Sequence, residues 1–198
     1  MVGWARRSES PSSTQEVSAW GGNMECQQLV QNPDGTLALA PVETVRKAMN
    51  QRRELLIPGT AVAVESGSRY TFADVFTSYE RFMLTGEFRF TGDGSFGLAF
   101  DFGKKEDEYK LVSISPKDGK IGLAFNEGKD QITEMAVNLE KDHDYAFTYV
   151  QEGSVGVFYI DGIAALTVRI YGTTGKPIRL FAENNNVVFS CLREYTME

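Results

Sequence analysis

From about Ala61 to its end, the chain is predicted to fold as a single antiparallel all-β domain built as a two-sheet sandwich. Short runs in which apolar and polar residues alternate predict strands with one buried face. Turn signals recur at intervals of about 8–12 residues, as is typical of sandwiches. Aromatic residues make up 12% of the chain, with 13 Phe and 8 Tyr, and such residues favour pleated, half-buried surfaces. Nothing suggests alternating strands and helices, which argues against a parallel sheet.

The predicted strands follow one another as hairpins. They cover residues 85–91, 95–101, 109–114, 121–125, 145–150, 155–160, 164–170, 178–182 and 187–195. The first two are joined by Gly92-Asp-Gly94, and the next pair by Pro116-Lys-Asp-Gly119. Both connections carry residues that favour tight turns, so the strands they join are expected to be neighbours.

Residues 1–41 differ from the rest. Asn32-Pro-Asp-Gly35 lies between two short apolar runs and predicts a hairpin turn. An isolated hairpin is marginal in water, so this segment must lean on another surface. Its apolar residues are candidates for an interface: Trp4, Trp20, Met24, Leu29, Leu37 and Leu39. We therefore predict self-association through residues 1–41, with docking onto the chain's own sandwich or an unfolded segment as alternatives.

Residues 42–58 are predicted to form a connector helix, from Pro41 to about Leu55. Proline suits the first turn of a helix, and Glu43 lies where the helix dipole favours a negative charge. Pro58-Gly59 ends any helix. Residues 59–198 then form the sandwich module.

Charge narrows the range of partners. The net charge is −7 and the pI is about 4.9, and no basic stripe is present, so nucleic acid and anionic membrane surfaces are not expected as partners. A neutral partner such as a sugar is compatible with this charge. The chain contains neither a stretch of about 20 apolar residues nor an apolar signal core, so as it stands it is predicted to be cytoplasmic.

Cysteine and histidine are scarce. The chain has Cys26, Cys191 and His143, and neither cysteine lies in a Cys-x-x-Cys motif. We therefore expect no metal site and no cofactor. The cysteines are interpreted as buried free thiols, and His143 as an exposed turn residue before a strand.

Several motifs near the C-terminus resemble one family. The chain reads Ser154-Val-Gly-Val-Phe-Tyr-Ile-Asp-Gly162, then Leu166-Thr-Val-Arg-Ile-Tyr171, Ile178-Arg-Leu-Phe-Ala-Glu183 and Val187-Val-Phe-Ser190. This series resembles the C-terminal β-sandwich of glycoside hydrolase family 32, which contains invertases, inulinases and levanases. The resemblance implies a jelly-roll or concanavalin-like sandwich.

The N-terminal residues agree with this resemblance. Val2-Gly-Trp4, Trp20-Gly-Gly22, Asp34-Gly-Thr-Leu37 and Pro41-Val42 look like the last part of the family's catalytic β-propeller. There are two departures. Gly156 stands where the family has an acidic residue, and Gln151-Glu152 replaces its Asp-Arg, so no function of those side chains carries over.

Catalytic residues are not evident in this chain. A retaining glycosidase needs two carboxylates, a nucleophile and an acid/base. The family's Trp-Met-Asn-Asp-Pro-Asn-Gly-like nucleophile motif and its Arg-Asp-Pro motif are both missing. Glu25-Cys26 mimics the acid/base dipeptide, but its neighbours match the last propeller blade instead. Gly-x-Ser-x-Gly and phosphate-binding glycine motifs are also absent.

Sugar binding remains as a hypothesis. Sugar sites combine an aromatic face with charged groups that bind hydroxyls. The family-like strands carry Asp161, Arg169, Tyr171 and Glu183, and Tyr79, Glu80 and Arg81 form a second charged-aromatic cluster. Each of these is also explained as an ordinary strand or turn residue.

Three functions therefore stay open. The first is a non-catalytic module of a fructan- or sucrose-cleaving glycosidase, which binds fructose-containing carbohydrate or stabilises its propeller. The second is a fragment of an enzyme whose missing half supplies catalysis. The third is a stand-alone lectin-like or self-associating interaction protein.

Overall fold

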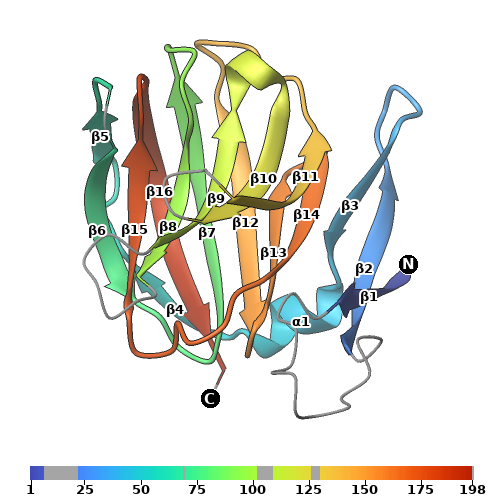
Figure 1. The fold of residues 1–198 in the computed structure, drawn as a ribbon. Helices are drawn as coiled ribbons and strands as arrows, with labels where there is room; N and C mark the ends of the chain where they lie inside the picture. Colours follow the sequence, from blue (N-terminus) through green and yellow to red (C-terminus); the bar gives the residue numbers. More distant parts are fainter. Residues whose placement is uncertain (7–21, 69, 102–108, 126–129, 198) are drawn as a thin grey trace, which may run out of the picture.

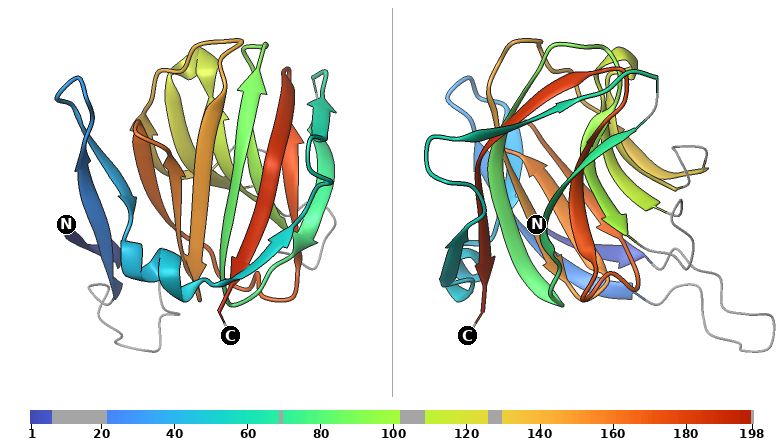
Figure 2. Two further views of the ribbon diagram at one scale, coloured as in Figure 1. Left: turned by 180° about the vertical axis from the view of Figure 1, so that it is seen from behind. Right: turned by 90° about the vertical axis from the view of Figure 1, so that its left-hand side faces the viewer.

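The protein is built from two large antiparallel sheets packed face to face, with a smaller three-stranded sheet beside them (Figure 1). The computed structural model describes residues 1–6, 22–68, 70–101, 109–125 and 130–197. Two further views show the large sheets as separate layers and the small sheet standing at one edge (Figure 2). The predicted antiparallel sandwich is confirmed.

The six-stranded sheet faces the viewer in Figure 1 and has the order β11-β10-β9-β8-β15-β6. Its strands are β6 (Thr71–Thr77), β8 (Phe96–Asp101), β9 (Tyr109–Ser115), β10 (Lys120–Phe125), β11 (Asp130–Ala136) and β15 (Pro177–Ala182). A single 3-10 turn, η1 (Pro116–Asp118), joins β9 to β10, and Gly119 follows it with a φ of 60°. This is the turn that the Pro-Lys-Asp-Gly sequence predicted.

The seven-stranded sheet lies behind it, in the order β14-β13-β12-β7-β16-β4, with β5 pairing the first part of β16. Its strands are β4 (Gln51–Glu54), β5 (Ala61–Glu65), β7 (Arg81–Phe90), β12 (Tyr145–Glu152), β13 (Val155–Ile160), β14 (Ala164–Arg169) and β16 (Asn186–Thr196). All predicted strands after residue 84 are present, whereas β4, β5, β6 and β11 were not identified individually.

The core between the two sheets is aromatic. Phe147 and Phe158 stack with ring centroids 5.4 Å apart, and Phe158 is 2% exposed. Phe181 is fully buried, as predicted, but it belongs to a small second cluster with Ala99 and Leu111 rather than to the main core. That cluster lies on the outer face of the six-stranded sheet, so this face carries packed side chains of its own.

The N-terminal sheet, as we name residues 1–6 and 22–41, contains β1 (Val2–Arg6), β2 (Gly22–Gln31) and β3 (Leu37–Pro41). The predicted hairpin is confirmed: the amide N–H of Asn32 donates to the carbonyl of Thr36 (2.8 Å), and Gly35 has a φ of 88°. Strand β1 adds a third member by pairing with β2. The side chains of Trp4 and Trp20 lie outside the described residues.

The predicted connector helix is shorter than expected. Helix α1 spans Glu43–Ala48, and the backbone leaves it at the buried Met49. Residues 51–54 instead form the edge strand β4, which pairs with the end of β16. The cause is tertiary: Arg53 Nη2 lies 2.5 Å from Glu194 Oε2, and Glu194 is buried. Pairing with a strand that is distant in the sequence, supported by this contact, thus replaces the helix expected for the segment.

The expectation of buried cysteines is wrong. Cys26 and Cys191 are both free and exposed. Cys191 lies where the pairing of β16 with β7 shifts between Ser190 and Arg193, and its φ is 53°. This bulge turns its side chain away from the core. His143 is exposed before β12, as predicted.

Two positions at which the sequence departs from the family pattern, Gln151 and Gly156, are neighbours in the structure. Gln151 on β12 lies opposite Gly156 on β13. The hydroxyl of the buried Tyr149 donates to Gln151 Oε1 (2.9 Å), and a Cβ on Gly156 would lie 2.2 Å from that hydroxyl oxygen. Gln151 is itself fully buried and donates to Thr173 Oγ1 (3.0 Å). The tyrosine therefore occupies the space that a side chain at position 156 would need.

Candidate functional site

The outer face of the six-stranded sheet combines aromatic, hydroxyl and charged groups. Because side chains alternate along a strand, β9 directs Val112 and Ile114 into the core and Ser113 and Ser115 to the outer face. Strand β10 alternates in the same way, with Lys120 on the outer face. One side of this sheet is thus apolar and sealed, and the other presents polar groups.

Small residues form a hollow in this face. The pairing places Gly97, Ser113 and Gly122 in one row across β8, β9 and β10. Gly97 has a φ of 149°, and a Cβ there would lie 2.1 Å from the carbonyl oxygen of Val112, so no side chain fits. The hollow has a volume of about 230 Å³, and we name it the outer trough. It is lined by Tyr70, Ser95, Leu111, Ser113, Ser115, Asp118, Lys120, Gly122, Ala124 and Glu183.

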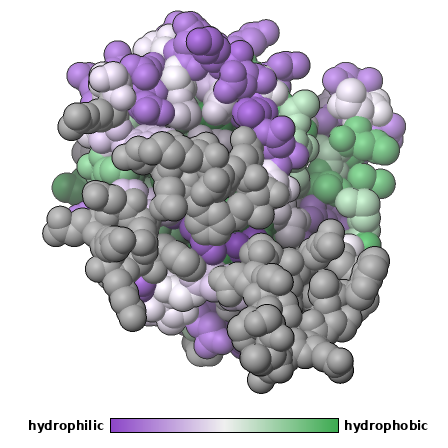
Figure 3. All heavy atoms as spheres, in the orientation of Figure 1, coloured by the Kyte–Doolittle hydropathy of each residue, from purple (hydrophilic) through white to green (hydrophobic). Residues whose placement is uncertain are grey.

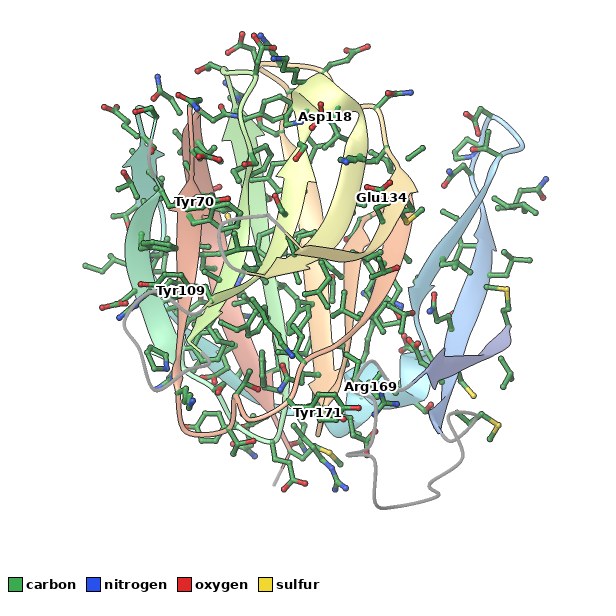
Figure 4. All side chains as sticks on the ribbon, in the orientation of Figure 1. Tyr70, Tyr109, Asp118, Glu134, Arg169 and Tyr171 are labelled. Carbon is green, nitrogen blue, oxygen red and sulfur yellow. The ribbon has the colours of Figure 1, made fainter. Side chains whose placement is uncertain are left out.

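Aromatic rings flank one side of the trough. Tyr70 meets Phe181 edge to face, with centroids 5.4 Å apart, and Phe72 lies 4.8 Å from Tyr109. Figure 4 shows Tyr70 and Tyr109 over the same end of the sheet. The half-buried Tyr70 rests on the buried Phe181. Such a fixed ring is suited to contact with the C–H surface of a sugar.

Carboxylates occupy the other positions around the trough. The Ser95 hydroxyl donates to Glu183 Oε2 (3.3 Å), which orients that carboxylate. Lys120 Nζ donates to Glu134 Oε2 (2.9 Å), and this hydrogen bond raises the pKa of Lys120. Asp118 is exposed in η1 (Figure 4). The trough therefore offers oriented acceptors beside an aromatic wall.

The structure does not bring the four predicted sugar-binding residues together. Glu183 lines the outer trough. Asp161 lies in the turn between β13 and β14, where the carbonyl of neighbouring Gly162 accepts a hydrogen bond from Asn32 of the N-terminal sheet (2.8 Å). Its carboxylate accepts from Thr148 Oγ1 (3.5 Å).

Arg169 and Tyr171 form a separate pair at the end of β14 (Figure 4). The guanidinium carbon of Arg169 lies 5.8 Å from the Tyr171 ring centroid, and Nη1 donates to Ser154 Oγ (2.9 Å). Lys110 Nζ lies 5.5 Å from the same centroid. Arg169 is only 6% exposed, which does not fit a residue on a solvated face. These contacts are of the kind that stabilise a fold.

The second predicted cluster is assembled, but on an open surface. Tyr79, Glu80 and Arg81 border a shallow hollow of about 530 Å³ together with Thr196 and Met197. Tyr79 is 49% exposed, and Arg81 lies 3.4 Å from Glu152. This cluster is a second candidate surface, without the row of small residues that shapes the outer trough.

Glu25 lies between the N-terminal sheet and the sandwich. Thr167 Oγ1 on β14 donates to Glu25 Oε2 (2.9 Å), and Gln27 Nε2 donates to Glu25 Oε1 (3.1 Å). Burial raises the pKa of Glu25, and these hydrogen bonds oppose the rise. An apolar cleft of about 270 Å³ that includes Met49 and Tyr159 adjoins it. In this structure Glu25 holds two parts of the fold together.

Sequence reasoning found Glu183 but missed Tyr70, Ser113, Asp118 and Lys120 as parts of one site. The alternation of Ser113 and Ser115 with buried residues was visible in the sequence, but the residues that lie beside them on β8 and β10 depend on the register of the strands. Among the described residues, no group of three His, Cys, Asp or Glu side chains is placed to hold a metal ion. None of the described helices has the length and apolar character needed to cross a membrane.

The fold is an antiparallel β-sandwich. Solved structures with this fold include the carbohydrate binding module CBM66 from Bacillus subtilis, with a TM-score of 0.58 and 15% identity, over 73% of this chain and 95% of that one. The Aspergillus kawachii beta-fructofuranosidase matches with a TM-score of 0.61 and 16% identity, over 86% of this chain and 33% of the enzyme.

A third structure matches the whole chain. Sucrose-6-phosphate hydrolase from Lactobacillus gasseri aligns over 100% of this chain and 38% of its own, with a TM-score of 0.59 and 13% identity. The chain thus spans between 33% and 38% of the length of these two enzymes. No protein-family model and no curated protein matches the chain. The resemblance read from the sequence is thus matched at the level of fold by a beta-fructofuranosidase and a sucrose-6-phosphate hydrolase.

Proposed function

We propose that this chain is a non-catalytic, sugar-binding β-sandwich module that works beside a catalytic domain, and that its outer trough binds fructose-containing carbohydrate. The observation that supports this most is the trough itself, where a fixed tyrosine faces hydroxyl and carboxylate acceptors. Aromatic contact combined with a few oriented polar groups is the usual composition of small-ligand sites. The fructose specificity rests on the sequence motifs.

Binding can be measured directly by calorimetry with the full chain. Sucrose and short inulin and levan oligosaccharides serve as ligands, with a glucose-only oligosaccharide as the comparison. Tyr70→Ala is expected to weaken binding at least tenfold, because the ring supplies the apolar wall. Tyr79→Ala, at the second candidate surface, is expected to leave binding unchanged. Circular dichroism would verify that both variants are folded.

Other outcomes are equally informative. Loss of binding in Tyr79→Ala alone would move the site to the second cluster. No binding to any of these sugars would refute the sugar-binding proposal. Fructose released during the titration, and abolished by Glu25→Gln, would refute the non-catalytic assignment.

The N-terminal sheet supports a second, separable part of this proposal, namely an interface with another domain or copy. Among the described residues, several of its large apolar side chains are strongly exposed: Met24 is 68% exposed, Leu29 54% and Leu37 62%, whereas Leu39 is half-buried. Figure 3 shows apolar residues gathered over this sheet. Exposed apolar patches of this kind usually mark interaction sites.

Sedimentation would distinguish between the two possible partners of this sheet, a second copy of the chain and another domain. We propose that the isolated chain self-associates through this sheet and that the double variant Leu29→Asp/Leu37→Asp is monomeric at tens of micromolar. Ile57→Asp is the control, because Ile57 is 76% exposed and lies away from this sheet, between β4 and β5. It should sediment like the unmodified chain. If the unmodified chain is itself monomeric at tens of micromolar, self-association is refuted, and a catalytic domain remains as the partner of this surface.

A further inference from the structure

The charges around the outer trough are unequal. Among the described residues that line it or pair with its lining, Asp118, Glu183 and Glu134 are acidic and Lys120 is basic. Lys120 is already engaged by Glu134 at 2.9 Å. Lys120 also interacts electrostatically with Asp118. The one ammonium group among the described lining residues is therefore shared by carboxylates, and the trough keeps an excess of negative charge.

We propose that the outer trough selects by charge, admitting neutral sugars and rejecting phosphorylated ones. This inference rests on the proposed function, since it specifies which sugars enter the same site. A phosphate ester carries one to two negative charges at neutral pH. A phosphate ester placed beside Asp118 and Glu183 would be repelled by their negative charges. The ammonium group of Lys120 lies nearby but already binds Glu134.

The position of Glu183 makes it the principal specificity residue. Its carboxylate is half-buried and is held by the Ser95 hydroxyl at 3.3 Å. A partly buried charge is less screened by salt than an exposed one, so its repulsion persists at moderate ionic strength. Asp118 is exposed, so its contribution is more strongly screened.

Phosphate-binding sites are built differently. They commonly use arginine forks, lysines or clusters of backbone N–H groups. In the trough, the lining charges of the described residues are mainly carboxylates, which accept hydrogen bonds from sugar hydroxyls and give nothing to a phosphate oxygen. The hydroxyl groups of a neutral sugar can donate hydrogen bonds to these carboxylates. The phosphate group of a phosphorylated sugar has the same charge as the carboxylates and is repelled by them.

The test compares sucrose with sucrose 6-phosphate, titrated into the full chain by calorimetry at low salt. Sucrose is expected to bind about tenfold more tightly than sucrose 6-phosphate, or better. Repulsion between charges a few ångströms apart is large enough to lower the affinity by about this factor. Raising the salt concentration is expected to narrow the difference.

Variants identify the residue responsible. Glu183→Gln keeps an acceptor for Ser95 and removes the charge, so binding of sucrose 6-phosphate should strengthen several-fold while binding of sucrose changes less. The matched control is Glu87→Gln, because Glu87 is also half-buried and accepts from a serine, Ser190, at 3.3 Å, outside the trough. It should change neither affinity.

The outcomes separate the two proposals. Equal or tighter binding of the phosphate would overturn charge selection and leave sugar binding intact. If sucrose 6-phosphate binds more weakly than sucrose but Glu183→Gln does not raise its affinity, the role of Glu183 is overturned. If neither sugar binds, the proposed function fails and the charge selection that rests on it fails as well.

Discussion

The sandwich and the N-terminal sheet are made of similar strands but are stabilised in different ways. The sandwich buries stacked aromatic residues between two sheets, so that Phe82, Phe90 and Phe96 have no exposed surface. The N-terminal sheet leaves large apolar residues in contact with solvent, Leu29 and Leu37 among them. Its attachment to the sandwich includes polar contacts, from Asn32 to the carbonyl of Gly162 and from Gln27 and Glu25 to Thr167. A strand pattern alone therefore says little about how firmly a strand is held.

The largest effect is expected in the aromatic core. Phe158→Ala removes a ring that stacks on Phe147 and should lower the free energy of unfolding by about 3–5 kcal/mol. Leu29→Ala, in the N-terminal sheet, should change it by less than about 0.5 kcal/mol because Leu29 is exposed. Urea unfolding of both variants would test the comparison. Similar losses in the two would mean that the N-terminal sheet contributes to the core.

A smaller loss is expected from filling the space beside Tyr149. Gly156→Ala places a Cβ 2.2 Å from the tyrosine hydroxyl oxygen, and overpacking of this kind costs about 1–3 kcal/mol. Gly153→Ala is not an adequate control because its φ is 57°. Ala165→Ser, on the neighbouring strand and half-buried, is a milder comparison. A Gly156→Ala variant as stable as the unmodified protein in urea would show that Tyr149 moves freely.

The smallest effect concerns the attachment of the N-terminal sheet. Burial raises the pKa of Glu25 in the folded protein above its ordinary value of 4.5. The contribution of such a group is greatest below its unfolded pKa and is lost as the pH rises through the folded pKa. Lowering the pH from 7 to 5 should therefore strengthen this attachment, by less than about 1 kcal/mol because Glu25 is partly solvated.

Hydrogen exchange of the β2 and β3 amides, corrected for intrinsic rates, would measure this change. Glu194 has a pKa shifted in the same direction, also by burial, so the comparison must be with Glu25→Gln. That variant should show a smaller gain in protection on acidification. An identical pH response in the two proteins would show that Glu25 does not control the attachment.

The sequence by itself determined most of the architecture. Alternation along residues 85–91 and the Asn-Pro-Asp-Gly and Pro-Lys-Asp-Gly turns located strands and hairpins, because side-chain period and turn conformation are local properties. It also singled out Glu183 as a candidate, although the other three candidate residues lie elsewhere in the fold.

Only the tertiary structure decided how these strands meet. Residues 51–54 became a strand because their backbone pairs with the end of β16, about 140 residues away in the chain, where Arg53 also contacts Glu194. The outer trough depends on the register that places Ser113 of β9 beside Gly122 of β10 in its lining. Register and long-range pairing are set by the fit of the whole core and not by any local pattern. For that reason the sequence indicated a sugar-related sandwich, and the fold placed the candidate site on one face of it.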